Sequence, residues 1–225
     1  MARKTKLEAA ITREQLLDAA ERVFREHGVA RTSLAEVAAA AGVTRGAVYW
    51  HFKDKADLFT AMCERATLPL DALLCDAALA PCADPLETLR ELSIGVLTSL
   101  ATDPRAQAVF EVIFEKTELT GELANVAGER ERERSQCVAN VEQLVQRAVA
   151  AGQLAADTDT ALTARLLHAC VGGIMREWVS DKGAYDLAAR APAFIEAILA
   201  GVVAHPPRRA ERVRPRVRPR APSPA

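Results

Sequence analysis

Two short helices separated by a turn at Gly42 limit what the N-terminal part of this chain can fold into. Ser33 and Glu36 are spaced as a capping box, in which a hydroxyl and a carboxylate satisfy free backbone N–H groups at the start of a helix. Thr44, just beyond the turn, is placed to cap the second helix. A helix of about nine residues cannot bury enough surface to be stable alone. We therefore expect the two to pack on a third helix as a helix-turn-helix.

Helix caps and apolar periodicity predict helices along the rest of the chain. The predicted starts are Thr12 or a neighbour, Asp54, Asp84-Pro85, Asp103-Pro104, Gly121, Asp159 and residue 187. We therefore expect an all-α protein in three parts. Residues 1–54 form the three-helix helix-turn-helix domain, residues 55–205 a larger helical domain, and residues 206–225 an Arg/Pro tail that is disordered or extended.

The composition suits a soluble helical protein and not a disordered one, since 50% of the residues are hydrophobic. The five cysteines form no CxxC pair, so we expect neither a disulfide framework nor a zinc site. The basic N-terminus lacks the apolar run of a signal peptide. No segment approaches the roughly 18 apolar residues of a membrane span. We expect a cytoplasmic protein.

Charge is distributed unevenly along the chain. Residues 1–60 carry 10 basic and 8 acidic side chains, whereas residues 61–205 carry 12 basic and 21 acidic ones. The tail from Pro206 carries seven arginines and one glutamate. A mildly basic N-terminal unit on an acidic body indicates that a polyanion would dock at the N-terminal end.

The stretch VTRGAVYWHFKDK, which contains the second short helix, has four ring-bearing side chains in a row in a chain that is 4% aromatic. Val48 and Phe52 lie one turn apart and are expected to face the core. Arg45 and Tyr49 lie one turn apart on another face, where the N-terminal half of a recognition helix would meet DNA. The alternative is an ordinary solvated face. For Trp50, wedging between helices and contact with a phosphate are both open.

The segment ARTSLAEVAAAAGVTRGAVYWHFKDKADLF closely resembles the DNA-binding segment of the TetR (tetracycline-repressor) family, especially its AcrR-type members that control multidrug efflux pumps. The match includes the Y-x-H-F-x-x-K signature, is dense over residues 10–60 and is weaker beyond. The resemblance implies a homodimer that represses transcription from a palindromic operator until a hydrophobic or aromatic small molecule binds its C-terminal ligand-binding and dimerisation domain. The DNA contacts that it implies are Thr32, Ser33, Thr44, Arg45, Gly46, Tyr49, Trp50, His51 and Lys55.

An effector cavity in the larger domain would be lined by apolar side chains of its middle helices, with a few polar groups to orient the ligand. The residues that the resemblance suggests for this role are Leu92, Val96, Phe110, Phe114, Val141, Leu144, His168, Val171 and Arg176. The alternative is that the apolar positions are plain core. His168 would then be a satisfied core histidine and Arg176 an ion-pair partner.

The last two long helices carry signs of close contact. Gly172 and Gly173 cost helix stability, roughly 1 kcal/mol each relative to alanine, so a tight helix crossing or a nearby ligand should justify them. The resemblance assigns these two helices, with Trp178 and Phe194, to the dimer interface. The alternative is that they close the core of a monomer.

Nothing in the sequence indicates an enzyme, a metal site or a cofactor. The four histidines show no HxxxH spacing, and G-x-S-x-G, P-loop and G-x-G-x-x-G motifs are missing. Two alternatives to a repressor stay open: an architectural DNA-binding protein without an effector, and a helical enzyme that acquired a helix-turn-helix. The Arg/Pro tail could add nonspecific affinity for DNA or only hinder aggregation.

Overall fold

The computed structural model describes residues 6–80, 83–118 and 121–209, and helices make up nearly all of it. The helices are α1 (Lys6–His27), α2 (Leu34–Ala40), α3 (Arg45–His51), α4 (Lys55–Leu79), α5 (Pro85–Thr102), α6 (Pro104–Glu115), the 3-10 turn η1 (Gly121–Leu123), α7 (Ala124–Ala150), α8 (Thr160–Ser180) and α9 (Leu187–Ala204). Within the described residues, the only extended pairing is an isolated backbone bridge between Thr158 and Arg208. The all-α prediction is confirmed.

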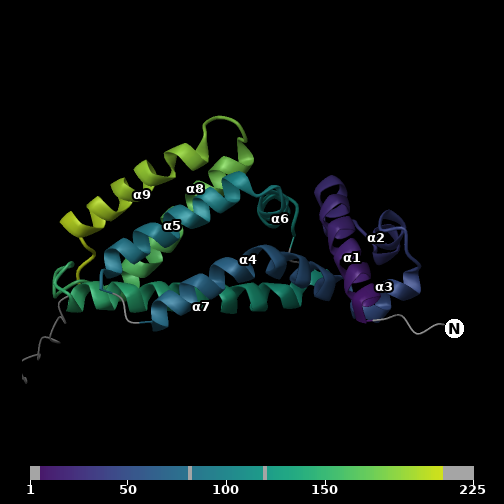
Figure 1. The fold of residues 1–225 in the computed structure, drawn as a ribbon, viewed down its shortest axis with the longest axis horizontal. Coiled ribbons are helices and arrows are strands. Elements are labelled where there is room, and N and C mark those ends of the chain that lie inside the picture. Colours follow the sequence, from purple (N-terminus) through teal and green to yellow (C-terminus); the bar gives the residue numbers. More distant parts are fainter. Residues whose placement is uncertain (1–5, 81–82, 119–120, 210–225) are drawn as a thin grey trace, which may run out of the picture.

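The first three helices form a helix-turn-helix unit at one end of an elongated molecule (Figure 1). Between α2 and α3, Gly42 has a φ of 67°, a conformation that favours glycine. α1 packs against α2, and its Arg13 lies over the ring of Phe52 at the end of α3. α1 begins at Lys6 and not near Thr12. The hydroxyl of Thr12 donates to the carbonyl of Glu8 one turn earlier. The predicted cap was therefore wrong, because a threonine can also satisfy its hydroxyl inside a helix.

The core of the helix-turn-helix unit extends beyond residues 1–54. Buried side chains of α1, α2 and α3 pack with Phe59 of α4, Val112 of α6 and Val126 of α7 in one continuous cluster. The unit is therefore seated on the rest of the chain through a shared apolar core. The boundary expected at residue 54 coincides with the cap of α4, while the packing continues across it.

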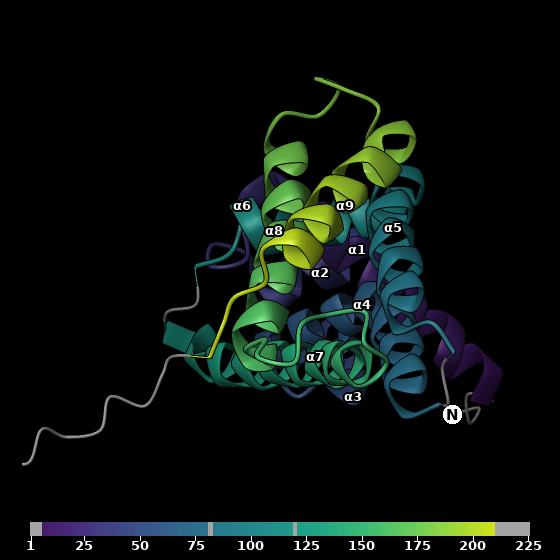
Figure 2. The same ribbon diagram turned by 90° about the vertical axis from the view of Figure 1, so that its left-hand side faces the viewer.

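The remaining helices form the larger part of the molecule. α4 and α7 run side by side along its base, and α5, α8 and α9 lie above α7 (Figures 1 and 2). A second buried cluster fills this part, with contributions from α5 to α9. Its largest members include Leu97, Leu144, Trp178 and Ile195.

Most of the predicted helix starts are confirmed. The side chains of Asp54, Asp84, Asp103 and Asp159 each accept a backbone N–H at the start of α4, α5, α6 and α8. The helix expected from Gly121 begins with the η1 turn and continues as α7. The backbone of Gly121 has a φ of 57°, which an α-helix does not accommodate.

α9 corrects one expectation about apolar segments. Its 18 residues have a mean hydropathy of 1.7, so by length and composition alone it meets the requirement for a membrane span. Ala191, Ile195, Leu199 and Val202 recur at helical spacing and are buried. This is the pattern of an amphipathic helix with one face on a protein core. The opposite face is exposed.

The chain after α9 returns to the loop between α7 and α8, at the end of the molecule opposite α1–α3 (Figure 1). The N–H of Asp159 donates to the carbonyl of Pro207 at 2.7 Å, and the N–H of Arg209 donates to the carbonyl of Asp157 at 3.0 Å. Arg208 also pairs with the Asp157 carboxylate. Residues 206–209 of the expected tail are therefore extended and held, because their backbone finds partners. The rest of the tail lies outside the described residues.

Candidate nucleic-acid interface

Two caps hold α2 and α3 in place. The N–H of Ser33 donates to the Glu36 carboxylate at 2.7 Å, and the N–H of Glu36 donates to Ser33 Oγ at 3.3 Å, which confirms the capping box. The N–H of Ala47 donates to Thr44 Oγ1 at 3.3 Å, which confirms the cap of α3. The backbone hydrogen bond from Ser33 lowers the pKa of Glu36. This carboxylate is therefore charged at neutral pH.

One face of α3 is anchored in the core. Val48 is fully buried and Phe52, the C-cap residue, is nearly so. The guanidinium of Arg13 on α1 lies 5.4 Å from the centroid of the Phe52 ring. A seven-residue helix is too short to be stable alone, so these contacts keep α3 folded and leave its other face open.

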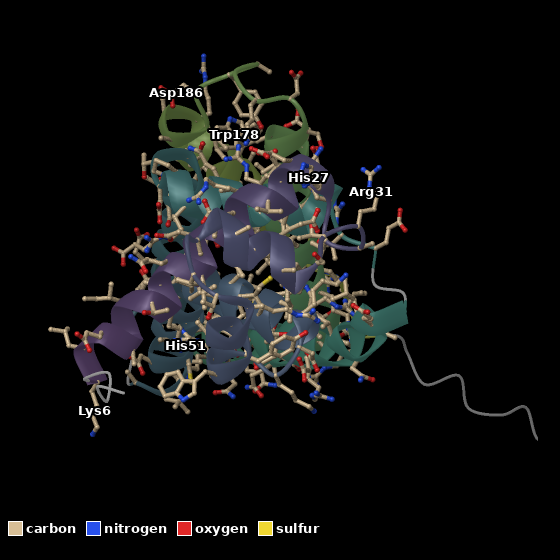
Figure 3. All side chains as sticks on the ribbon, turned by 90° about the vertical axis from the view of Figure 1, so that its right-hand side faces the viewer. Lys6, His27, Arg31, His51, Trp178 and Asp186 are labelled. Atoms are coloured by element: carbon tan, nitrogen blue, oxygen red, sulfur yellow. The ribbon has the colours of Figure 1, made fainter. Side chains whose placement is uncertain are left out.

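The open face of α3 carries Arg45, Tyr49 and Trp50. Arg45 Nη2 donates to Tyr49 Oη at 3.3 Å, and its guanidinium carbon lies 5.6 Å from the Tyr49 ring centroid. Trp50 is 71% exposed, which contradicts the alternative that it wedges between helices. The rings of Trp50 and His51 meet edge-on with centroids 4.6 Å apart. Figure 3 looks onto this end of the molecule, with His51 in its lower half.

The acidic residues that follow α3 are used as helix caps. Asp54 Oδ1 accepts the N–H of Asp57 at 2.9 Å, and Asp57 Oδ2 accepts the N–H of Lys53 at 2.9 Å. Each of these carboxylates therefore accepts a backbone N–H at the start of α4. The cationic side chains of Arg45 and Lys53 are both exposed near the open face.

Two of the residues expected to contact DNA have hydroxyls that are used inside the protein. Thr32 is buried, and its hydroxyl donates to the carbonyl of Gly28 at 2.9 Å. The hydroxyl of Ser33 donates to the Glu36 carboxylate at 2.8 Å and accepts the Glu36 N–H. Both positions lie at the start of α2, where free backbone and side-chain groups need partners.

Lys55 also makes contacts within the chain. Its Nζ donates to the carbonyls of Ala30 and Thr32 at 3.0 Å each and lies 3.3 Å from the Glu122 carboxylate. The ammonium is thus turned toward the α1–α2 loop and η1, away from the open face of α3. Loop carbonyls without a helical partner attract it there. The structure makes Lys55 a tie between α4, this loop and η1.

The residues expected to line an effector cavity converge from four helices. Leu144 and Phe110 are buried in the second core. The partly buried residues packed against the same core are Leu92, Val96, Phe114, Val141 and Val171. His168 is half-buried, and burial, together with the charge of Arg134, lowers its pKa. The seven apolar positions therefore form one region, and His168 lies on α8, which contributes Val171 to it.

Arg176 is exposed on α8 and covers the end of α6. Its guanidinium carbon lies 4.6 Å from the ring centroid of Phe114, and its Nη1 donates to the Phe114 carbonyl at 3.4 Å. The side chain therefore closes the apolar region at its surface. The sequence analysis expected Arg176 to contact a ligand inside this region. To do so, Arg176 would have to move away from Phe114.

A shallow polar depression lies elsewhere, on the helix-turn-helix unit. Its lining residues are Glu26, His27, Arg31 and Glu36, and Figure 3 places His27 and Arg31 well away from His51. The polar lining does not suit an apolar ligand. Among the residues that the structure describes, no three His, Cys, Asp or Glu side chains are grouped to hold a metal ion.

α8 and α9 each present an exposed apolar face. On α8, Leu162 is 51% and Leu166 is 41% exposed. The exposed residues of α9 include small ones, namely Ala189, Ala193, Ala197, Ala200 and Gly201. A Cβ added at Gly173 or Gly201 would meet no atom within 4 Å. No neighbour within the described chain therefore accounts for these two glycines.

Ion pairs join the helix-turn-helix unit to the rest of the chain, and sequence analysis missed them. Arg65 on α4 contacts three carboxylates of α1, at 3.3 Å for Glu14, 2.6 Å for Asp18 and 3.1 Å for Glu21. The spacing of these carboxylates along one face of α1 was a visible signal. Their common partner was not, because it lies far along the chain.

Comparison with protein families gives two matches that together cover most of the chain. Residues 16–62 match the model for bacterial regulatory proteins of the tetR family. Residues 84–203 match the model for the C-terminal region of MAATS-type transcriptional repressors. The HTH-type transcriptional regulator AcrR of Shigella flexneri is 40% identical over 202 residues, which cover 88% of this chain and 93% of that protein.

Two solved structures resemble this one over nearly their whole length. NalD, the secondary repressor of the MexAB-OprM multidrug efflux pump in Pseudomonas aeruginosa, gives a TM-score of 0.78 at 33% identity and covers 86% of this chain and 96% of its own. A complex of SmeT with triclosan gives a TM-score of 0.77 at 33% identity, covering 85% and 91%. SmeT is the repressor of the Stenotrophomonas maltophilia multidrug efflux pump SmeDEF.

Proposed function

The chain belongs to the TetR family of bacterial regulatory proteins, and we propose that it represses transcription by binding a palindromic operator as a homodimer that a hydrophobic small molecule releases. The family consists of transcriptional regulators and not of enzymes, and this chain is related to repressors of multidrug efflux pumps. The observation that carries the proposal is the open face of α3, where Arg45 and Tyr49 are held as a pair above a core anchored by Val48.

In the proposed complex, α3 lies in the major groove. A recognition helix meets base edges with its N-terminal residues, which here are Arg45 and Gly46, next to the cap Thr44. Arg45 reaches a guanine edge or a phosphate, and Gly46 allows the backbone to come close. Tyr49, Trp50 and His51, further along α3, contact the DNA backbone. Lys55 serves this interface indirectly, by holding the α1–α2 loop.

Dimerisation is proposed to join the exposed faces of α8 and α9 to those of a second copy. Leu162 and Leu166 are apolar surface that a partner would cover, and Gly173 and Gly201 would let helices of the two copies approach closely. A two-fold axis at this four-helix interface brings the same surface together from both copies. It would place two copies of α3 in successive major grooves about 34 Å apart.

The proposed effector is a hydrophobic or aromatic small molecule, bound among the apolar residues of α5 to α8. Support comes from the partly buried side chains there and from the triclosan complex of SmeT. Binding releases DNA only if the ligand favours a conformer in which the two α3 helices are displaced. NalD and SmeT are repressors of multidrug efflux pumps, which supports an efflux operon as the regulated unit. A regulator that binds operator DNA would act in the cytoplasm, where the chromosome lies.

Fluorescence anisotropy tests this function. The chain is titrated into a labelled duplex from the DNA upstream of its own gene, at near-physiological salt, with unlabelled random DNA as competitor. Apolar aromatic compounds, triclosan among them, are then added to the complex. Tight binding that random DNA does not displace, and that one compound reverses, is the expected result. Weak binding that random DNA removes equally well would instead indicate an architectural protein.

A further inference from the structure

Glu111 on α6 joins three separate elements. Its Oε2 accepts a hydrogen bond from Arg25 Nη2 of α1 at 3.1 Å and another from Lys182 Nζ, in the turn between α8 and α9, at 2.6 Å. The Glu111 side chain is 18% exposed, so water and salt screen these pairs less than pairs on the open surface. Partial burial alone would raise the pKa of Glu111, but the hydrogen bonds from Lys182 and Arg25 outweigh it and lower the pKa.

The end of α6 lies between the helix-turn-helix unit and α8. The carbonyl of Lys116, the C-cap residue of α6, accepts the N–H of Val29 in the α1–α2 loop at 3.1 Å. On the other side, Arg176 of α8 donates to the carbonyl of Phe114. The turn between α8 and α9 lies at the end of the larger part that is nearer to α1 (Figure 1). Glu111 is therefore placed where a shift of that turn can reach α1 directly.

We propose that Glu111 is a positioning residue that makes the α8–α9 turn, α6 and α1 move together. The inference rests on the proposed function, in which α8 and α9 form the dimer interface and α1 supports α3. Without the carboxylate, Arg25 and Lys182 lose their common partner, and the turn loses its ionic link to α1. Coupling between two sites is reciprocal. Operator binding at α3 must therefore change the α8–α9 turn, just as a change at that turn alters operator binding.

Reciprocity permits a test that needs no effector. Amide hydrogen exchange of the turn is measured by mass spectrometry in the free protein and in the protein saturated with operator duplex. The reporters are the N–H groups of Asp181 and Ala184, which donate to the carbonyls of Glu177 and Asp181. We expect operator binding to slow their exchange in the native chain. Glu111→Gln keeps the size of the side chain, removes its charge and should lose most of this slowing.

Arg25, Glu111 and Lys182 would act in series, as a relay between α1 and the α8–α9 turn. This arrangement predicts a different result from that of independent contacts. Arg25→Gln and Lys182→Gln each cut one link, so each should lose as much of the slowing as Glu111→Gln. The double variant should lose no more than either single one, whereas independent contacts would add. Glu131→Gln is the matched control, because it removes the charge of an exposed ion pair with Arg134 and leaves the three relay residues in place. It should keep the native response.

The outcomes separate the relay from the function on which it rests. The relay is refuted if the native chain binds its operator while the turn exchanges equally fast in both states. It is also refuted if Glu111→Gln responds as the native chain does, or if the losses in the double variant add. Thermal unfolding of every variant checks that the response is not lost through unfolding. A native chain that fails to bind the duplex in anisotropy refutes the proposed function, and the relay with it.

Discussion

The guanidinium of Arg65 donates to the carboxylate of Asp18 at 2.6 Å and fixes α4 against α1. Arg65→Met should destabilise the fold, since three carboxylates of α1 would lose their shared cation. Burial already raises the pKa of Glu21, and Arg65 opposes that rise. We expect the free energy of unfolding to fall by about 1–3 kcal/mol, between the values for exposed and buried ion pairs. Urea unfolding at pH 7 measures it. Arg134→Met, which breaks an exposed pair with Glu131, is the control and should cost about 0.5 kcal/mol or less.

Tyr49→Ala should weaken operator binding by about 10-fold to 100-fold, since the ring and hydroxyl lie on the open face of α3. The residue is exposed, so thermal unfolding should change little. Anisotropy with the operator and with random DNA measures the effect. An operator affinity equal to that of the native chain would contradict the proposed role of α3.

Gly46→Ala should separate stability from DNA binding. An added Cβ would lie 3.9 Å from Thr44 Oγ1, an ordinary contact, and alanine favours a helix by up to about 1 kcal/mol. We therefore expect a stability equal to or above that of the native chain, together with weaker operator binding. Gly42→Ala is the contrasting variant. Gly42 has a φ of 67°, which strains an alanine, so this substitution should lower the free energy of unfolding by about 1–2 kcal/mol. Undiminished operator affinity in Gly46→Ala would show that the backbone of α3 does not approach the DNA closely.

Leu166→Glu should yield a folded monomer. The side chain is 41% exposed, so the charge disturbs the proposed interface and not the core. Light scattering after gel filtration gives the mass, and circular dichroism checks the fold. Ala161→Glu, at an exposed position on another side of α8, should stay dimeric. A dimeric Leu166→Glu chain would place the interface elsewhere, and a monomeric native chain would contradict the proposed homodimer.

Cys63 and Cys137 should resist thiol reagents in the folded protein. Burial raises the pKa of Cys63 to about 12 and that of Cys137 to about 11, so few thiolates form at pH 8. Iodoacetamide labelling followed by peptide mass spectrometry should modify both slowly in buffer and quickly in urea. Rapid labelling of Cys63 in the native state would indicate that the α4–α7 contact opens.

The helix-turn-helix could be predicted because its signals are local. The Ser33–Glu36 cap and the Thr44 cap involve residues three positions apart, and the turn needs only the backbone freedom of Gly42. Each signal is complete within a few residues. The same locality explains why the helix start predicted near Thr12 was wrong. A threonine that caps a helix and one inside a helix have similar neighbours in the sequence, and α1 begins earlier, at Lys6.

The candidate site was only partly predictable. Sequence patterns placed Arg45 and Tyr49 on one face of α3 and Val48 on the other, and the structure agrees. The resemblance also implied DNA contacts for Thr32 and Lys55, whose partners in the α1–α2 loop could be identified only after folding. An exposed Trp50 was one of two open alternatives.

The sequence by itself determined where most of the helices begin, which residues share a helix face, and the resemblance that the family matches confirmed. Only the tertiary structure decided what covers each face. Leu162 and Leu166 on α8 are spaced like core residues of a helix, yet both are exposed. Arg65 and Glu111 form ion pairs between helices that are far apart in the chain. The physical reason is that helical periodicity depends on neighbouring residues alone. Burial and ion pairing depend on how helices distant in sequence dock.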